Sequence, residues 1–427
     1  MTDVPIPPQP TETDVAVKMR NEVVDDLIAE GTITSGPVEA AMRKVSRELF
    51  APGAPLEEVY HRYNGVVTKR DDDGTAISSV SAPQVQAYMM EAAGITPGMN
   101  ILEYGGGGAN AAMLAELVGD TGQVTTVDID PDVTERAARV LAETGYSRVK
   151  VILADAEDGV PSPDGYDRIM VTFGAYDVPP AWTSQLAENG RLLVPLQLRG
   201  LSRTIAFEKE GDHLVSYTSK LFGFVPVQGA GAHEATLIVM RDGEVTFRFD
   251  EALTFDPNQL RDVFDTPRTE VWSGATIGRT EPWDTAHLWL ATALPGFCRV
   301  VLDKSKNSGL ISPPGSHTAA SAVVEGDSFA YVTTRGAADA PDVEFGAHAY
   351  GPHADELAEQ LAEQLRIWAN EHRGGPGAKF YIHPAGTPGD ALPPGRVIDK
   401  PHSRITISWP ASATAGAGQG AMHHPNE

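Results

Sequence analysis

The alternation of apolar and polar positions changes its period along the chain. Between Asp14 and Phe50, apolar residues recur at helical spacing, which predicts two or more helices. From Met99 onward, short apolar runs alternate with amphipathic stretches. We expect strands at NILEY, QVTTVDI, VKVILAD, YDRIMVTF and GRLLVPLQL, with helices at AAMLAELVG, DVTERAARVLAETG and PAWTSQLAENG. Buried strands that alternate with helices indicate an α/β domain with a parallel, doubly wound sheet.

The second half of the chain has a less regular pattern. Residues 204–227 read as a hairpin with a Gly-Asp turn. Beyond it we expect helices at WDTAHLWLATAL and HADELAEQLAEQLRIWANEHR, and strands at FAYVTT, KFYIH and SRITISW. We therefore predict a first domain over 16–235 and a second, α+β domain over 236–411.

Three other stretches lack a periodic pattern. The Pro-rich residues 1–15 and the Gly-rich residues 412–427 are predicted to be disordered. The polar stretch TKRDDDGTAISS, residues 68–79, is predicted to be a loop.

Composition narrows the possible partners. The chain has 427 residues and a formal net charge of -25, which argues against nucleic acid or an anionic membrane surface as the main partner. No apolar run approaches the ~20 residues that span a bilayer, and the N-terminus lacks a targeting pattern, so we expect a soluble, cytoplasmic protein. A single cysteine, Cys298, excludes an internal disulfide and multi-cysteine metal sites, and no metal is expected.

A glycine run and three acids form the first chemical pattern. Gly105 to Gly108 follow a predicted strand and open a predicted helix, a turn that lets backbone approach a nucleotide. Glu103, Asp128 and Asp155 end three successive strands. Glu103 would suit the cationic methionine end of S-adenosylmethionine (SAM), Asp128 its ribose hydroxyls and Asp155 its adenine amino group. The pattern favours SAM, and NAD is the alternative cofactor because dinucleotide enzymes use a similar turn.

A serine cluster forms the second pattern. Ser78, Ser79 and Ser81 stand just before Pro83, which is expected to begin a helix. The amides of such a helix start attract a carboxylate, and the Ser81 and Ser79 hydroxyls could aim one of its oxygens at a methyl group. Alternatively, Ser81 only caps the helix.

These residues resemble a known family. Ser79-Val80-Ser81-Ala82-Pro83 is similar to the Thr-Ile-Ser-x-Pro signature of the protein-L-isoaspartate O-methyltransferases. The later VDID, ADAEDG, YDRIMVTFGA and FGFVPV segments fit the same family, over about residues 17–235. Two positions depart from it: Ser79 stands in place of the threonine, and Ala109 in place of the third loop glycine.

The resemblance implies a Rossmann-like class I SAM methyltransferase with S-adenosylhomocysteine as product. It implies that Ser81 is catalytic, with Ser79 beside it. The residues that it places around the cofactor are Ser79, Val80, Ser81, Gln86, Glu103, Gly105, Gly107, Asp128, Ile129, Asp155, Ala156, Gln228 and His233.

The chain continues for about 190 residues beyond the part that resembles the family, and residues 236–411 are expected to form an accessory domain for peptide recognition. In this it looks like the extended variants that accompany ribosomal peptides such as lanthipeptides and graspetides. The resemblance implies methylation of an Asp side chain in a constrained, macrocyclic peptide, leading through aspartimide to isoaspartate. Two alternatives remain open: repair of isoaspartate in damaged proteins, and a non-catalytic peptide-binding module.

Overall fold

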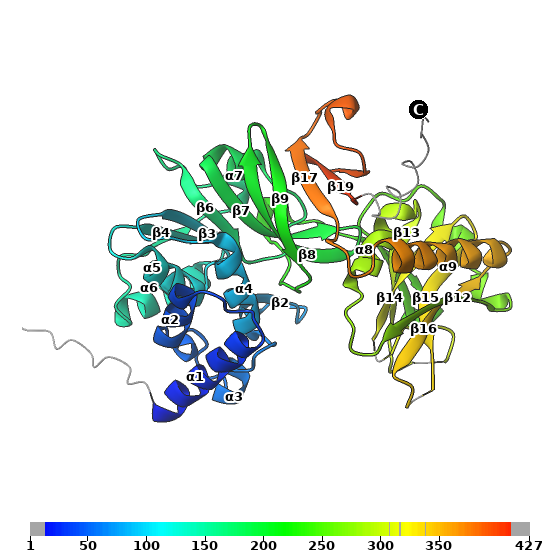
Figure 1. Ribbon diagram of the computed structural model, residues 1–427, viewed down its shortest axis with the longest axis horizontal. Helices are drawn as coiled ribbons and strands as arrows, with labels where there is room; N and C mark the ends of the chain where they lie inside the picture. The colour runs from blue at the N-terminus through cyan, green and yellow to red at the C-terminus, as the bar shows by residue number, and fades with distance from the viewer. Residues whose placement is uncertain (1–12, 307, 316, 338, 411–427) are drawn as a thin grey trace, which may run out of the picture.

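The first of two large sheets is a mixed sheet of ten strands, seven from the first part of the chain and three from its C-terminal part (Figure 1). The computed structural model describes residues 13–410 except 307, 316 and 338. Five parallel strands lie in the order β5-β4-β3-β6-β7, as the doubly wound prediction requires, and the remaining strands extend the sheet in antiparallel fashion. These strands are β3 (Asn100–Tyr104), β4 (Gln123–Asp128), β5 (Lys150–Leu153), β6 (Tyr166–Val171), β7 (Leu186–Leu198), β8 (Leu201–Glu210), β9 (His213–Lys220), β17 (Lys379–Pro384), β18 (Arg396–Asp399) and β19 (Ser403–Ser408).

Helices cover both faces of this sheet. Successive strand residues point to opposite sides, so the apolar strands present a hydrophobic face on each side that must be covered. Ile101 faces a core formed with the N-terminal helices, whereas Leu102 faces a core that also contains Trp182 of α7 (Pro180–Gln185). The helices of the first face are α1 (Asp14–Ala29), α2 (Gly36–Lys44), α4 (Pro83–Ala93), α5 (Ala109–Val118) and α6 (Pro131–Glu143), with the short α3 (Leu56–Val59) beside them.

A second, antiparallel sheet of seven strands follows, in the order β10-β11-β13-β14-β15-β16-β12. The helices α8 (Asp284–Ala293) and α9 (Ala354–Glu371) pack on it, as predicted for these two segments. Leu361 and Trp368 of α9 belong to the same hydrophobic cluster as Leu196 and Ile205 of the first sheet, so the two sheets share a core. The strands are β10 (Thr236–Met240), β11 (Val245–Phe249), β12 (Thr269–Gly278), β13 (Phe297–Leu302), β14 (Ala319–Glu325), β15 (Ser328–Arg335) and β16 (Asp342–Tyr350).

The chain then returns to the first sheet. β17 pairs with β9 through Tyr381–Val215 and Ile382–Leu214, and β18 and β19 continue beyond it. The predicted domain of residues 236–411 does not account for this return, because its last three strands extend the other sheet. Residues 1–12 and 411–427 lie outside the described part. Of the two ends predicted to be disordered, only residues 13–15 are described, and there α1 begins at Asp14.

Two local predictions were wrong. Residues 68–79 are not a loop but most of a hairpin, formed by β1 (Val66–Arg70) and β2 (Ala76–Val80). The Asp71 carboxylate accepts hydrogen bonds from the amides of Asp73 and Thr75, and these bonds stabilise the turn of the hairpin. The run of acidic residues had been interpreted as part of a loop. The helix predicted at 180–190 ends at Gln185, and the following residues belong to β7.

The turn between β7 and β8 fastens the two sheets together. Arg199 adopts a left-handed backbone conformation (φ 53°), and its buried guanidinium reaches the end of α8. It donates hydrogen bonds to the carbonyls of Ala291, Leu294 and Pro295. These carbonyls lack intrahelical partners, so the Arg199 side chain supplies a donor to each of them, and the Leu294 carbonyl also accepts the Phe297 amide.

Candidate active site

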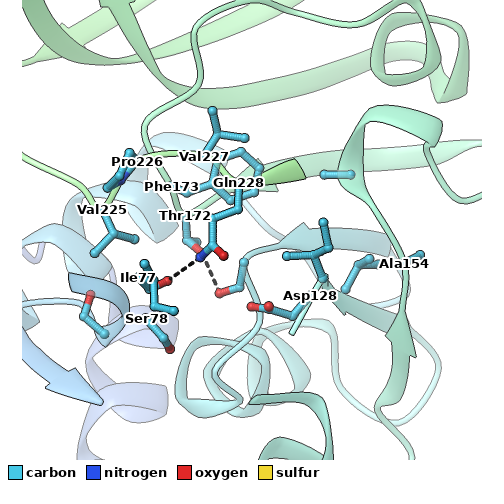
Figure 2. A pocket seen from close by; sticks show the side chains of 15 residues that line it. Ile77, Ser78, Asp128, Ala154, Thr172, Phe173, Val225, Pro226, Val227 and Gln228 are labelled. Atoms are coloured by element: carbon cyan, nitrogen blue, oxygen red, sulfur yellow. Dashed lines mark hydrogen bonds between the residues drawn. The ribbon is translucent and has the colours of Figure 1, made fainter. Parts of the chain in front are cut away.

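A cavity lies at the carboxyl ends of the parallel strands, where the strand order reverses between β3 and β6 (Figure 2). Ligands bind at this position in open α/β sheets. The lining residues come from the hairpin, the glycine loop, three strand ends and the segment after β9. They are Ile77, Ser78, Ser79, Gly105, Val127, Asp128, Ile129, Ala154, Ala156, Thr172, Phe173, Val225, Pro226, Val227 and Gln228.

The glycine loop is packed tightly on its inner side and open at one residue. A Cβ on Gly105, whose φ is 96°, would lie 2.5 Å from Thr172 Oγ1, and one on Gly106 would lie 1.8 Å from Thr126 Oγ1. The carbonyl of Val127 accepts the amides of both glycines. A Cβ on Gly107 would meet no atom within 4 Å, so this residue leaves space for a ligand against the loop.

Glu103 lies beneath the loop and does not line the cavity. Its carboxylate accepts a hydrogen bond from Asn110 Nδ2 at 2.8 Å and another from Thr126 Oγ1 at 2.6 Å. Burial raises the pKa of Glu103 to about 7, against the opposing effect of these two donors. Glu103 therefore organises the strand end and the start of α5.

The other two strand-end acids play different parts. Asp128 lines the cavity, and burial raises the pKa of its carboxyl. Asp155 does not line it: one carboxylate oxygen accepts the amide of Glu157, and the other accepts the amide of Ala230, both at 2.9 Å. Asp155 thus ties the segment after Gln228 to the end of β5.

The serine segment leads from the hairpin into α4. Ser78 and Ser79 both line the cavity. The hydroxyl of Ser78 also lies 2.9 Å from that of Thr68, at hydrogen-bonding distance. The first residue of α4 is Pro83, as predicted, but its N-cap is Ala82, which makes no side-chain capping bond. The alternative that Ser81 only caps this helix is therefore wrong.

The start of α4 is less available to a ligand than the sequence suggested. The amide of Gln84 donates to the carbonyl of Arg62, and the amides of Val85 and Gln86 donate to that of Ala82. Pro83 has no amide hydrogen. A carboxylate at this point would therefore depend on the serine hydroxyls for hydrogen bonds.

Arg47 is a buried residue that the sequence analysis missed. Its guanidinium donates to the Ser81 carbonyl at 2.9 Å and to the side-chain oxygen of Gln86. Burial lowers the pKa of Arg47 to about 10. Gln86 does not line the cavity. Its side-chain oxygen accepts a hydrogen bond from Arg47, which in turn donates to the backbone carbonyl of Ser81. No periodic or motif signal marks Arg47, because its partners are 34 and 39 residues away.

Two contacts fix the hairpin over the strand ends. Lys69 forms ion pairs of 2.6 Å with both Asp130 and Asp132, just after β4. On the other side, Gln228 Nε2 donates to the Ile77 carbonyl at 3.1 Å, as Figure 2 shows. The hairpin and the segment after β9 therefore meet across the cavity.

The predicted site residues separate into two groups. The structure brings Ser79, Gly105, Asp128, Ile129, Ala156 and Gln228 together in the cavity, whereas Val80, Ser81, Gln86, Glu103, Gly107, Asp155 and His233 do not line it. His233 stacks on Tyr176, with ring centroids 3.5 Å apart, in a neighbouring cavity. Thr172 and Phe173, which also line the cavity, were expected only as the last two residues of the strand YDRIMVTF; the observed strand β6 ends before them, at Val171.

The cavity suits a nucleoside. Asp128 can accept hydrogen bonds from two adjacent hydroxyls, and Ile129, Ala154 and Ala156 provide apolar walls for a flat ring. Within residues 13–410, apart from the three undescribed positions, no group of three or more His, Cys, Asp or Glu side chains could hold a metal. No described helix is long and apolar enough to cross a membrane.

Comparison with known proteins agrees with the resemblance seen in the sequence. The family model for protein-L-isoaspartate(D-aspartate) O-methyltransferase (PCMT) matches residues 18–232. The protein-L-isoaspartate O-methyltransferase of Ignicoccus hospitalis is 40% identical over 182 residues, which cover 42% of this chain and 82% of that protein. That of Pyrococcus horikoshii is also 40% identical, over 40% of this chain and 75% of its own length.

Solved structures resemble the chain less closely. A protein-L-isoaspartate O-methyltransferase structure has 22% identity and a TM-score of 0.47, and the similarity covers 85% of this chain and 96% of that one. A Plasmodium falciparum structure, described as a putative protein-L-isoaspartate O-methyltransferase in complex with S-adenosyl-L-homocysteine, has 17% identity and a TM-score of 0.43. The similarity covers 49% of this chain and 98% of the Plasmodium falciparum chain.

Proposed function

The chain belongs to the protein-L-isoaspartate(D-aspartate) O-methyltransferase family, and from this premise we propose that it methylates the side-chain carboxylate of an Asp residue in a modified, macrocyclic ribosomal peptide. SAM is the methyl donor and S-adenosylhomocysteine the product. The observation that carries the proposal is the cavity in which Ser79 of the serine segment, Gly105 of the glycine loop and Asp128 lie together.

The residues present fit the proposed cofactor. Asp128 would hold its ribose hydroxyls, and Ile129 and Ala156 its adenine. Gly107 does not line the cavity, but its open face leaves space beside the loop for the methionine part. When bound, SAM supplies a methyl group on a cationic sulfur.

The chemistry asks for orientation more than for acid or base catalysis. A carboxylate with an ordinary pKa near ~4 is already ionised at neutral pH, so its attack on the methyl carbon needs no general base. Holding nucleophile and methyl group in line can lower the barrier by about 7–11 kcal/mol. Ser79 and Ser81 are suited to this task, because neutral hydroxyl donors hold an anion without adding a charge that opposes the sulfonium.

The ester made in this way is more reactive than the acid. The following backbone nitrogen attacks the ester carbonyl, loses its proton, and expels methanol to form an aspartimide. Water then opens the ring to aspartate or isoaspartate.

The length of the chain supports a specialised substrate. The family model ends at residue 232, and the two relatives cover less than half of this chain, so the second sheet lies outside the part that they share. The names of the relatives favour a second candidate, repair of isoaspartate in damaged proteins.

One experiment separates the candidates. The protein is incubated with SAM and, in parallel, a linear isoaspartyl peptide, its linear Asp counterpart and a side-chain-crosslinked macrocyclic Asp peptide. We expect the mass of one added methyl group on the macrocycle, followed by loss of methanol. Turnover of the isoaspartyl peptide alone would favour repair, and methylation of none of the three would reject both activities.

A further inference from the structure

A groove opens where β9 and β17 diverge. Among the described residues, the two strands pair only through Leu214 and Val215 with Ile382 and Tyr381. Beyond this point the Phe380 amide donates to the Ser216 hydroxyl instead of to a backbone carbonyl. One edge of β9 from Tyr217 onward therefore faces an open groove and not a neighbouring strand.

The C-terminal part of the chain builds the opposite wall. Pro376 to Lys379 and Ser408 to Pro410 line the groove, and both stretches lie beyond the region that the family model matches. The Trp409 indole donates to Thr292 at 3.0 Å and packs edge-on against Trp289. The wall is thus fixed to the second sheet through α8.

The groove differs in charge from the rest of this acidic chain. Its lining contains hydroxyls, aromatic rings and Lys379, but no carboxylate. Lys220 at the end of β9 adds positive charge nearby, whereas the charge of Arg191, 4.8 Å from the Tyr217 ring centroid, is paired with Glu208. By contrast, the cavities beside Arg199 and His233 each contain carboxylates. On a chain of net charge -25, the groove is a surface that an acidic segment can approach.

The groove also connects to the catalytic cavity. The Thr218 hydroxyl lies 3.2 Å from that of Tyr88, five residues into the helix that begins at Pro83. The end of β9 continues through the exposed Leu221 into Val225 and Gln228, which line the cavity. A peptide held in the groove can therefore extend toward the serine segment.

We propose that this groove binds the part of the substrate peptide that flanks the methylated residue, as an acidic, extended strand added to the edge of β9. The backbone of the peptide pairs with the free edge, while Lys379 and the aromatic rings contact its side chains. This proposal rests on the proposed peptide methyltransferase activity, but its binding step needs no turnover.

The test therefore measures binding first. The probe is a fluorescein-labelled ten-residue peptide of alternating Glu and Thr, titrated with the full chain without SAM and followed by anisotropy. We expect saturable binding that Lys379→Glu weakens about tenfold, whereas Lys18→Glu, the same charge change on exposed α1, leaves it unchanged. N-methylation of alternate backbone nitrogens of the probe should abolish binding, because it removes the donors to the strand edge.

A kinetic arm links the groove to catalysis. Whichever Asp or isoaspartyl peptide is methylated is prepared with and without this acidic flank, and Lys379→Glu should raise the KM of the flanked form only. Methylation with no probe binding, or with equal effects on both forms, would overturn the groove proposal alone. Methylation of no peptide, with the probe still bound, would overturn only the proposed function. A dimer that Lys379→Glu dissociates, with no peptide bound, would assign the groove to a second copy of the chain and reject the proposal.

Discussion

The side-chain amide of Gln228 donates a hydrogen bond of 3.1 Å to the backbone carbonyl of Ile77, joining the segment after β9 to the β1–β2 hairpin. Both residues line the cavity, together with Asp128 and Gly105. Both partners come from parts of the chain that only the fold brings together, 151 residues apart.

Removing this bond should weaken the hold on the bound nucleoside. We expect Gln228→Ala to raise the Kd for S-adenosylhomocysteine about fivefold, since a single hydrogen bond contributes about 1 kcal/mol. Isothermal titration calorimetry measures the change, with Gln360→Ala on the exposed face of α9 as control. An unchanged Kd would show that the bond does not contribute to binding.

The serines should differ in their effect on turnover. Ser79→Ala and Ser81→Ala should each lower kcat about a hundredfold, because the role proposed for each hydroxyl is to orient the substrate carboxylate. Ser78→Ala is the comparison within the same segment. Ser78 also lines the cavity, but its hydroxyl is engaged with Thr68, so the change should affect stability by about 1 kcal/mol without a comparable loss of kcat. Equal losses for all three would contradict these roles.

Arg47 should act through Ser81. Arg47→Lys keeps the charge but loses the forked contact with Gln86 and the Ser81 carbonyl, so we expect kcat to fall about tenfold while KM for SAM stays within about twofold. Arg47→Met, which also removes the buried charge, should lower kcat at least as far. A loss in KM for SAM alone would place Arg47 in cofactor binding instead.

Glu103 should make stability depend on pH. Because burial raises its pKa to about 7, the folded chain binds this proton more tightly than the unfolded chain, whose carboxyl titrates near ~4.3. The stability that the protonated form contributes is present below about pH 4 and is lost as the pH rises through about 7. From about pH 5 to about pH 8, the free energy of unfolding should fall by up to about 3 kcal/mol relative to Glu103→Gln. Urea unfolding measures this, and a pH-independent difference would contradict it.

Arg199 should hold the two sheets together. Arg199→Met leaves the carbonyls at the end of α8 without their donor and should lower the free energy of unfolding by about 3 kcal/mol. Calorimetric unfolding of this variant is compared with that of Arg261→Met, which changes an exposed arginine. Equal melting temperatures for the two variants would rule out such a role.

The local pattern predicted most of the elements but not all of their pairings. Apolar runs such as NILEY and YDRIMVTF identified the parallel strands, because strands buried on both faces are apolar throughout. KFYIH and SRITISW were recognised as strands and included in the second domain, whereas both lie in the first sheet. β17 pairs with β9 more than 160 residues earlier in the chain, and strand period carries no information about so distant a partner. The hairpin at 66–80 was missed because its residues are mostly polar and do not alternate.

The site was predicted to a similar extent. Ser79, Gly105 and Asp128 stand in motifs whose local geometry determines where they lie, and all three line the cavity. Asp155 lies in a comparable motif but does not line the cavity. One of its carboxylate oxygens accepts a hydrogen bond from the amide of Ala230, a tertiary contact that the local sequence does not indicate. Arg47 likewise acquires its role only through folding.

The return of the chain to the first sheet also constrains how the protein folds during synthesis. β17 and β19 leave the ribosome more than 150 residues after β9. The sheet that carries the cavity therefore lacks its last strands while the second sheet is translated. During that interval the free edge of β9 is open to any strand that meets it. A nascent or truncated chain ending near residue 235 should therefore aggregate more readily than the full chain.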